Sequence, residues 1–555
     1  MTDENAWWKE AVVYQIYPKS FNDTDGDGVG DIQGIVEKLD YLDDLGVDVV
    51  WLNPVYESPQ EDDGYDVSDY RAIDDRFGSM EDWERLRDGL HERDIRLIMD
   101  LVVNHTSDQH AWFTASREDP DGEYGDYYMW MPGEPDDLPN NWGSCFGGPA
   151  WRYDREREEW YLHLFDPTQP DLNWRNPDVR DEVAELVDWW LQQGIDGFRM
   201  DVINFISKPE GLPDGDPDQD WVGLDHFANG PHVTEYLQEL SERTFDQYDA
   251  MAVGETPNVS VEDAREYTGD DGPLDMLFHF EHVRLDFVEK DWWDVGDWHV
   301  RELKEVFSRW QEGLADEGWN ALYLDNHDQP RSVSRFGDDE QYRYESATAL
   351  GTMLLTLRGT PFLYQGQELG MTNYPFDSLD EIRDADARNR VLGALDAGKI
   401  DSFESVKDVV RYRCRDNART PMQWDDSENA GFTDGSPWLP VNPNYETVNA
   451  AAERARDRSI WTYHRDCIAL RDDHDVLVYG DFDHLVPDHE QVFAYVRADD
   501  SERVLVTLNL TAQDALVELP VSGAVEQLLG NYDRDETDLA SLTLRPYEAQ
   551  IYRLS

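Results

Sequence analysis

The sequence contains little cysteine, no long apolar run and no recognisable leader. Its three Cys residues, Cys145, Cys414 and Cys467, form no CxxC pair, which argues against a disulfide framework and against a zinc motif. No stretch of 18 apolar residues is present to span a membrane. Residues 1–20 lack the basic start and apolar core of a signal peptide. We therefore expect a cytoplasmic protein without a membrane partner.

Positive charge is also scarce. The chain has 47 Lys and Arg residues, of which eight are Lys, against 121 Asp and Glu residues, so its formal net charge is −74. Nucleic acid is excluded as a ligand, because phosphate binding needs basic patches. Self-repulsion of this size destabilises a compact chain, and multimolar salt shortens the Debye length to about 3 Å or less. The composition predicts a high-salt cytoplasm; an acidic surface for a cationic partner is the alternative.

Eight short apolar runs alternate with amphipathic stretches. With 555 residues the chain exceeds one ordinary core. Apolar strands that alternate with helices indicate a parallel sheet buried on both faces, and eight such units predict a closed (β/α)₈ barrel. An open doubly wound sheet is the alternative, but no GxGxxG motif opens a helix. The runs occupy residues 12–18, 47–54, 95–105, 194–202, 250–256, 274–280, 320–328 and 359–368.

Other segments interrupt and follow this pattern. We expect the barrel within residues 1–105 and 174–475, with a second insertion at about 370–440. Residues 106–173 are rich in Trp, Tyr, Gly and Pro and predict an inserted subdomain. Short alternating strands within residues 476–555 predict a C-terminal antiparallel β domain.

The predicted strands carry polar residues at their carboxyl ends, where barrel enzymes have their active sites. One buried carboxylate can belong to a structural ion pair, and a lone His is more often a core residue. Four strand ends that converge by topology instead favour a functional site. The acidic residues at these ends are Asp100, Asp201, Glu255 and Asp328, and their neighbours include His105, Arg199 and His327.

Residues 21–31, FNDTDGDGVGD, place several carboxylates close together. An EF-hand loop needs Glu at position 12, which is Gly34 when counted from Asp23. A hard cation is still a fitting ligand, and a solvated acidic turn is the alternative. Flexible ligation by oxygen suits Ca²⁺ better than Mg²⁺, which stays possible. The expected ligands are Asp23, Asp25, Asp27, the carbonyl of Val29, and Asp31.

Six stretches together resemble the signature regions of the α-amylase family, glycoside hydrolase family 13: VVYQIYPKSF, DLVVNH, GFRMDVIN, VGETP, LDNHDQPR and GTPFLYQGQELGM. QPDLN at 169–173 and RDNARTPMQWD at 415–425 are similar to the oligo-1,6-glucosidase and α-glucosidase branch. The resemblance covers nearly the whole chain. It implies a barrel with a domain B after the third strand and a C-terminal β-sandwich.

The resemblance also implies catalytic roles. Asp201 matches the nucleophile, Glu255 the general acid/base, and Asp328 the carboxylate that stabilises the transition state. We expect Arg199 to keep Asp201 ionised, and the anionic Asp201 and Asp328 to keep Glu255 protonated. A matching loop binds calcium in this branch, which supports a structural metal at residues 23–31.

Further matches imply a glucose-binding pocket. His105, Arg199 and His327 match the shell around the sugar, and Tyr65 would stack on its ring. Asp62 and Arg415 match the pair that binds the non-reducing end, which makes the enzyme exo-acting. Trp112, Trp142 and Tyr128 either line the acceptor side or form the core of the insertion.

The implied function is a retaining, exo-acting α-glucosidase that hydrolyses α-1,4 or α-1,6 bonds of short malto- or isomalto-oligosaccharides. The resemblance implies that Val at position 202 favours α-1,6 cleavage, although the side chain can equally pack at a strand end. One alternative is a sucrose- or trehalose-type isomerase or a transglucosidase; RLDFV at 284–288 matches the isomerase stretch RLDRD only in part. Another is a non-catalytic sugar-binding relative that serves a membrane transporter.

Overall fold

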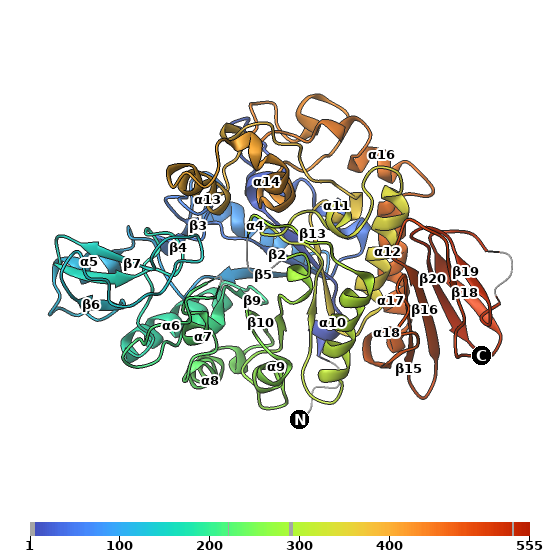
Figure 1. The fold of residues 1–555 in the computed structure, drawn as a ribbon, viewed down its shortest axis with the longest axis horizontal. Coiled ribbons are helices and arrows are strands. Elements are labelled where there is room, and N and C mark those ends of the chain that lie inside the picture. The colour runs from blue at the N-terminus through green and yellow to red at the C-terminus, as the bar shows by residue number, and fades with distance from the viewer. Residues whose placement is uncertain (1–5, 220, 288–291, 535–537) are drawn as a thin grey trace.

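The computed structural model describes residues 6–219, 221–287, 292–534 and 538–555 (Figure 1). Eight parallel strands form one sheet in the order β11-β10-β9-β5-β2-β1-β13-β12. A parallel bridge between Leu277 and Asn320 joins its two ends, so the sheet closes into the predicted barrel. The barrel strands are β1 (Val13–Ile16), β2 (Val49–Leu52), β5 (Arg96–Leu101), β9 (Gly197–Met200), β10 (Met251–Glu255), β11 (Met276–Phe278), β12 (Ala321–Leu322) and β13 (Thr360–Tyr364).

Amphipathic helices surround the barrel, and their ends follow local capping signals. Ser79 and Asp82 form a capping box at the start of α4, and Asn176 caps α6 just before Pro177. The longer helices are α3 (Leu39–Leu45), α4 (Met80–His91), α6 (Pro177–Gln192), α8 (Val233–Arg243), α9 (Val261–Thr268), α10 (Val300–Gly313), α12 (Arg343–Thr356) and α17 (Ile460–Asp473).

Side chains from alternate strand positions fill the barrel interior. Val13, Trp51, Val253 and Phe362 belong to one fully buried cluster, as the period of two in a strand requires. Arg199 is the register partner of Asp100 and Val253. The Arg199 side chain therefore lies on the same face of the sheet as Val253, which is the interior face of the barrel.

The glycine at the start of β9 has a steric cause. Gly197 has a φ of +151°, and a Cβ at this position would lie 2.2 Å from the carbonyl oxygen of Met251. Only glycine lets β9 approach β10 this closely. Because of this close approach, Arg199 lies next to β10, the strand that ends in Glu255.

The two predicted insertions contain regular structure of their own. Residues 106–173 include α5 (Ala111–Glu118) and a three-stranded antiparallel sheet of β6 (Trp130–Pro132), β8 (Glu159–Leu162) and β7 (Trp151–Asp154). This part projects on the left of Figure 1. Residues 370–440 include α13 (Ala385–Asp396), α14 (Lys407–Arg413) and α15 (Asp416–Arg419). In Figure 1 α13 and α14 lie above the barrel strands.

Antiparallel strands form the C-terminal part. The five-stranded sheet has the order β14-β15-β16-β20-β18, and β17 pairs with β19. Apolar residues of both sheets, such as Val492, Leu505, Val517 and Leu544, share one cluster. The strands are β14 (Asp481–His484), β15 (Val492–Ala498), β16 (Arg503–Asn509), β17 (Ala515–Val517), β18 (Val525–Gly530), β19 (Leu542–Leu544) and β20 (Ala549–Leu554).

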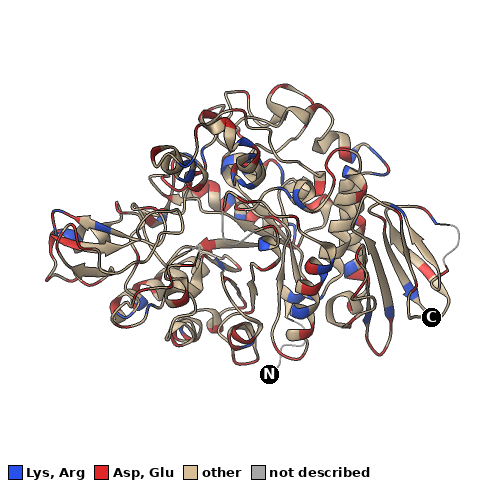
Figure 2. Cartoon of the chain, in the orientation of Figure 1, with Lys and Arg blue, Asp and Glu red and all other residues tan. Residues whose placement is uncertain are grey.

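Shorter elements connect these parts. They are α1 (Trp7–Glu10), α2 (Ile32–Val36), β3 (Tyr56–Glu57), β4 (Asp69–Ile73), α7 (Leu224–Phe227), α11 (Ser332–Phe336), α16 (Ala450–Arg454) and α18 (Asp475–Tyr479). Acidic residues are distributed over the helices and loops of all parts of the chain (Figure 2). Among the described residues, no helix combines the length and apolar character that crossing a membrane requires.

Candidate active site

The polar residues at the strand ends meet in one cavity. Asp201 follows β9, Glu255 ends β10, and Asp328 lies beyond β12. All three line the same cavity, because the strands of a parallel barrel end at one rim. Of the other predicted residues, Asp62, Tyr65, His105 and Arg415 line this cavity, whereas Arg199 and His327 are buried behind it.

Arg199 connects the two carboxylates that the resemblance assigns to catalysis. Its Nη1 lies 2.7 Å from Asp201 Oδ1, and its Nη2 lies 2.6 Å from Glu255 Oε1. The same Nη1 lies 2.6 Å from Asp100 Oδ1. The Arg199 side chain is 1% exposed, so these charge-assisted bonds form out of water, where they are strong. One cation therefore holds Asp201 and Glu255 together at the cavity wall.

The protonation of Asp201 differs from the sequence expectation. Burial raises the pKa of Asp201 well above its usual value; Arg199 opposes this shift, and Glu255 and Asp100 add to it. Three carboxylates share one guanidinium, which cannot offset the cost of burying all three as anions. Arg199 acts on Asp201 in the expected direction, but burial and the neighbouring acids oppose it. Burial thus works against the anionic form of Asp201.

A strained backbone aims a donor at Glu255. Val202 has a φ of 35° and a ψ of 41°, the left-handed region that β-branched residues rarely adopt. In this conformation its N–H donates to Glu255 Oε2 at 3.2 Å. Strain of this kind persists where the surrounding structure enforces it, as at active sites. Sequence reasoning considered only the side chain of Val202, and no local pattern signals the backbone turn.

Asp328 lies among two guanidinium groups and an imidazole. Its Oδ1 is 2.6 Å from Arg419 Nη2 and 3.3 Å from Arg415 Nη1, and its Oδ2 is 3.2 Å from His327 Nε2. Burial alone would raise the pKa of Asp328, but these three groups together hold it well below its usual value. Asp328 is thus a fixed anion beside the cavity. Arg419 was missed in the sequence, although it lies in the quoted stretch RDNARTPMQWD.

Asp62 and Arg415 face each other at 3.6 Å, between Asp62 Oδ1 and Arg415 Nη2. Arg415 makes its closest ion pair elsewhere, from Nε to Asp384 Oδ1 at 2.8 Å. Burial raises the pKa of Asp62 to about 7, although Arg415 and Arg419 oppose the shift. The predicted pair of Asp62 and Arg415 is present. The closer ion pair of Arg415 is with Asp384, which the sequence patterns did not indicate.

Tyr65 and His105 line the cavity, and His327 packs behind Tyr65. The rings of Tyr65 and His327 stack with centroids 5.2 Å apart and planes 2° from parallel. Asn53 Nδ2 donates to Tyr65 Oη at 2.7 Å, which fixes the ring. Burial lowers the pKa of His105 to about 4, so His105 is neutral near pH 7. The wall therefore offers a rigid ring face and uncharged imidazole.

Aromatic residues line the cavity away from these groups, but they are not the residues suggested above. Trp142 and Tyr128 are buried in core clusters, Trp112 packs against His110 with centroids 4.5 Å apart, and none of the three lines the cavity. The aromatic lining consists of Phe146, Phe165, Trp221, Phe280, Phe287, Trp292 and Tyr412, together with Tyr65. Of the two alternatives given for Trp112, Trp142 and Tyr128, packing in a core therefore holds and the acceptor side does not; Trp142 packs against Phe227 of α7, outside the insertion.

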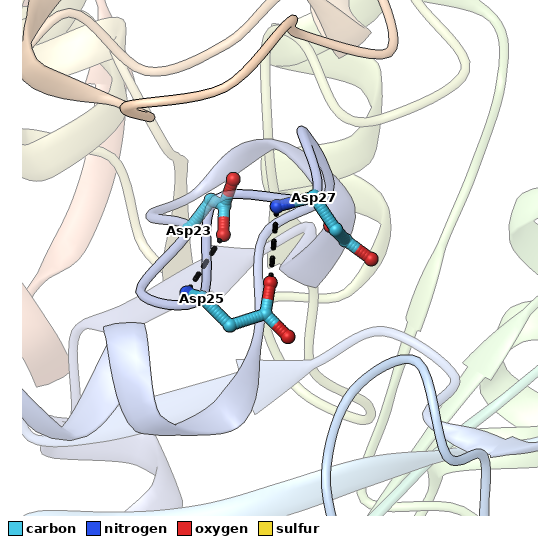
Figure 3. Close-up of side chains that lie close together, drawn as sticks. All are labelled: Asp23, Asp25 and Asp27. Atoms are coloured by element: carbon cyan, nitrogen blue, oxygen red, sulfur yellow. Dashed lines mark hydrogen bonds between the residues drawn. The ribbon is translucent and has the colours of Figure 1, made fainter.

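The acidic loop brings three of its carboxylates together (Figure 3). Ligand atoms of Asp23, Asp25 and Asp27 all lie within 4.8 Å of one another. This spacing fits a cation with oxygen ligands. Backbone N–H groups of the loop also donate to these carboxylates, from Asp25 to Asp23 at 3.1 Å and from Asp27 to Asp25 at 3.1 Å.

Asp31 is placed differently from the other expected carboxylate ligands. Asp31 caps α2 by accepting from Gly34 N at 2.6 Å, and it also accepts from Thr24 N at 2.7 Å. It lies outside the group of three acids. The N–H of Val29 donates to Asp27 Oδ1 at 2.7 Å. The sequence spacing grouped Asp31 with the others, but its oxygens satisfy the start of a helix.

Comparison with known proteins agrees with this geometry. The model of the α-amylase catalytic domain matches residues 15–480, and that of the maltogenic amylase C-terminal domain matches residues 482–551. The chain is 50% identical to the oligo-1,6-glucosidase of Bacillus cereus, over 99% of this chain and 100% of that protein. It is 45% identical to the trehalose-6-phosphate hydrolase of Bacillus subtilis, over 100% of this chain and 99% of that protein. The crystal structure of a Klebsiella isomaltulose synthase matches with a TM-score of 0.96 at 42% identity, covering 100% of each chain.

Fold and site together define a glycoside hydrolase: a closed (β/α)₈ barrel whose rim gathers paired carboxylates around a guanidinium. Both family models and the full-length relatives agree on this class. The chain belongs to the α-amylase family, glycoside hydrolase family 13.

Proposed function

We propose that the protein is a retaining, exo-acting α-glucosidase that acts on short isomalto- or malto-oligosaccharides. The observation that carries the proposal is the shared guanidinium: Arg199 binds both Asp201 and Glu255 at the wall of one cavity. A retaining mechanism needs a nucleophile and a proton donor about 5–5.5 Å apart on one sugar. Binding to one guanidinium keeps the two carboxylates close together, as that mechanism requires.

In the first step the carboxylate of Asp201 attacks the anomeric carbon. The bond to the leaving oxygen breaks, and Glu255 gives its proton to that oxygen. This mechanism requires that Glu255 carries a proton and that Asp201 is an anion when substrate binds. Arg199 then stabilises the ionised Asp201, and the N–H of Val202 points at Glu255 Oε2.

In the second step water replaces Asp201 at the anomeric carbon. Glu255 lost its proton in the first step, and the negative charge of Asp201 is absent from the glycosyl ester, so the Glu255 carboxylate can accept a proton from the attacking water. The carboxylate of Asp201 leaves, and the product is α-glucose. The fixed anion Asp328 favours the positive charge that develops on the ring.

Exo-action is supported by the pair of Asp62 and Arg415, which line the cavity and lie 3.6 Å apart. Asp384 binds Arg415 from outside the cavity lining. Charged groups of this kind suit the hydroxyls of a terminal glucose.

A preference for α-1,6 bonds is supported by Val202 after the nucleophile and by similarity to proteins named oligo-1,6-glucosidase. We expect Val202→Thr to shift the ratio of kcat/KM values from isomaltose towards maltose. Thr is also β-branched, so the strained backbone is kept. An unchanged ratio would show that Val202 only packs at the strand end.

The test of the function is the anomer of the first product. Proton NMR of isomaltose hydrolysis in high salt should show α-glucose before mutarotation; fresh β-glucose would exclude the mechanism. Sucrose tests the alternative activity. Glucose and fructose are expected, whereas isomaltulose or trehalulose as the main product would favour the isomerase.

We further propose that Asp23, Asp25 and Asp27 hold a structural Ca²⁺, with Mg²⁺ as the alternative. Three carboxylates that share one small region repel one another unless a cation offsets them. Chelation should lower the melting temperature, and added Ca²⁺ should restore it. A melting temperature indifferent to both would identify a plain acidic turn.

The cellular setting that we propose is a high-salt cytoplasm, with a small oligosaccharide as the binding partner. The net charge of −74 supports the proposed high salt concentration, because salt screens the repulsion between the acidic residues.

A further inference from the structure

A second groove of the molecule is lined by groups that the proposed mechanism does not use. It lies where β4, the start of α5 and α6 meet, on the left of Figure 1. Its volume is about 250 Å³, just below the range of about 300–1,000 Å³ of typical small-molecule pockets. The groove therefore has room for about one sugar ring. Its lining includes Asp69, Tyr70, Arg71, His110, Trp112 and Glu182.

Two aromatic residues give the groove apolar surface. The rings of Tyr70 and Trp112 have centroids 6.4 Å apart and planes inclined by 36°. Tyr70 is 5% exposed, and Trp112 is half-buried. Aromatic rings that border a groove provide large apolar contacts for a ligand.

A histidine of the groove has a hydrogen-bond donor to spare. His110 is 6% exposed, and its Nδ1 accepts from the backbone N–H of Trp112 at 3.1 Å. Burial lowers the pKa of His110 to about 4, so the ring is neutral near pH 7 and its single hydrogen is on Nε2. Nε2 has no hydrogen-bond partner among the described residues. This donor is therefore available to a ligand.

Charged groups of both signs border the groove as well. Arg71 is exposed and Glu182 is half-buried. The Arg71 guanidinium lies 5.8 Å from the ring of Trp189. Within the part of the chain that the structure describes, the side chains of Arg71 and Glu182 form no hydrogen bond and no ion pair. A charged donor and a charged acceptor are thus both uncommitted at one groove.

This mixture of groups selects the class of ligand. An anion would be repelled by Asp69 and Glu182, and a cation would be repelled by Arg71. A sugar ring is neutral, and its hydroxyls both donate and accept hydrogen bonds. Its C–H groups can also pack on the rings of Tyr70 and Trp112. A neutral sugar therefore matches the groove better than an ion does.

One side chain connects the groove with the active site. Tyr70 Oη lies 2.6 Å from the carbonyl oxygen of Val102 and 3.2 Å from that of His105. Tyr70 lines the groove, and His105 lines the active-site cavity. The groove is therefore separated from the cavity by the length of about one tyrosine.

We propose that this groove is a second sugar-binding site, which holds one ring of an isomalto- or malto-oligosaccharide outside the active-site cavity. The choice of sugar rests on the proposed function. Tyr70 and Trp112 contact the C–H groups of the ring, and His110, Arg71 and Glu182 bind its hydroxyls. The site takes no part in the cleavage of the glycosidic bond.

The test is calorimetric titration of isomaltotriose into Asp201→Asn, which does not hydrolyse it, at constant high salt. We expect two binding events per chain. Addition of Arg71→Met and Glu182→Ala should weaken one of them by about tenfold or more, since hydrogen bonds to charged groups are lost, and should leave the other unchanged. Both side chains are at least partly exposed, so the fold should tolerate their replacement.

Glu185→Ala is the matched control. Glu185 is exposed on the same helix, α6, but does not line the groove. In the Asp201→Asn background this variant should keep both binding events. With Asp201 intact, Arg71→Met with Glu182→Ala should hydrolyse p-nitrophenyl α-glucoside with the kcat and KM of the wild type, because the active-site cavity is unchanged.

A single binding event in Asp201→Asn would overturn the inference. So would two unchanged events in the groove variant, or an equal loss in Glu185→Ala. If the double replacement does not fold, Glu182→Ala alone decides in the same way. A wild type that hydrolyses no α-glucoside would instead overturn the proposed function, so the two failures are distinguishable.

Discussion

At the scale of single residues, cations decide what the carboxylates of this site can do. Asp201 and Glu255 share Arg199, whereas Asp328 has Arg415, Arg419 and His327. The pKa of Asp201 rises and that of Asp328 falls. Two acids of one cavity thus differ in how readily they carry a charge, because their neighbouring groups differ.

Asp201→Asn tests the nucleophile. The amide cannot attack the anomeric carbon, so turnover of p-nitrophenyl α-glucoside should fall by about 10⁴-fold or more. Isomaltose binding, measured by calorimetry, should remain, and the melting temperature should not fall, because one buried charge is removed. The control is Asp181→Asn, whose side chain is 60% exposed. Turnover above about one per cent of wild type in Asp201→Asn would contradict the assignment.

Asp62→Asn tests the raised pKa of about 7. An unfolded Asp ionises near pH 4, so folding holds a proton on Asp62 between about pH 4 and 7, and wild-type stability falls as pH rises through this window. The melting temperature of Asp62→Asn relative to wild type should therefore increase from pH 4 to 7 and stay constant above.

The same titration should appear in substrate binding. Wild-type KM should fall as the pH rises through about 7 and Asp62 ionises, whereas KM of Asp62→Asn should be higher and nearly independent of pH in this range. A wild-type KM without any change between pH 5 and 9 would argue against a role for the charge.

At the scale of elements, the acidic loop contacts a segment that is distant in the sequence. Asp23 N donates to Phe432 O at 2.9 Å, and Trp438 N donates to Gly28 O at 3.0 Å. Asp23 also accepts from the hydroxyl of Thr433. The loop after β1 thus packs on the segment after α15, and a cation among its carboxylates would strengthen this contact.

Gly28→Ala should disrupt that contact. Gly28 has a φ of +95°, and an added Cβ would lie 1.9 Å from the carbonyl oxygen of Ser436. Gly26→Ala is the matched control, since Gly26 has a φ of +81° but no atom within 4 Å of the added Cβ. Gly26→Ala should cost about 1–2 kcal/mol of unfolding free energy from backbone strain alone.

The additional clash should make Gly28→Ala clearly less stable than Gly26→Ala by thermal denaturation in constant salt and calcium. Equal losses in both variants would show that the loop does not pack on Ser436 in solution.

At the scale of the whole molecule, net charge governs stability. A charge of −74 spread over all parts of the chain repels itself. Lowering salt from molar concentration to about 0.1 M lengthens the Debye length from about 3 Å to about 10 Å. We expect the far-UV circular dichroism signal and the melting temperature to fall together.

Sodium chloride and sodium sulfate at equal ionic strength separate screening from other salt effects. If screening dominates, the two salts should restore the signal at similar ionic strength, whereas exclusion from the surface favours sulfate. A circular dichroism signal unchanged in about 0.1 M salt would contradict the proposed salt adaptation.

Much of the architecture could be predicted from the sequence. Each of the eight apolar runs contains a barrel strand, although the run at 320–328 keeps only Ala321–Leu322 as strand. Buried parallel strands need continuous apolar residues, and this local pattern is visible in one dimension. The same logic placed Asp201, Glu255 and Asp328 at one rim, because strand direction alone fixes which end meets the active site.

What only the tertiary structure decided is how the charges pair. Asp63 and Arg419 lie 356 positions apart, and Gln169 and Asp62 lie 107 apart. Such contacts have no local signal, because folding brings together loops from different strands. The sequence by itself determined the barrel and the residues at its rim. The tertiary structure decided that Arg199 serves two carboxylates, that Val202 turns left-handed, and that Asp31 caps a helix, since each depends on distances and burial.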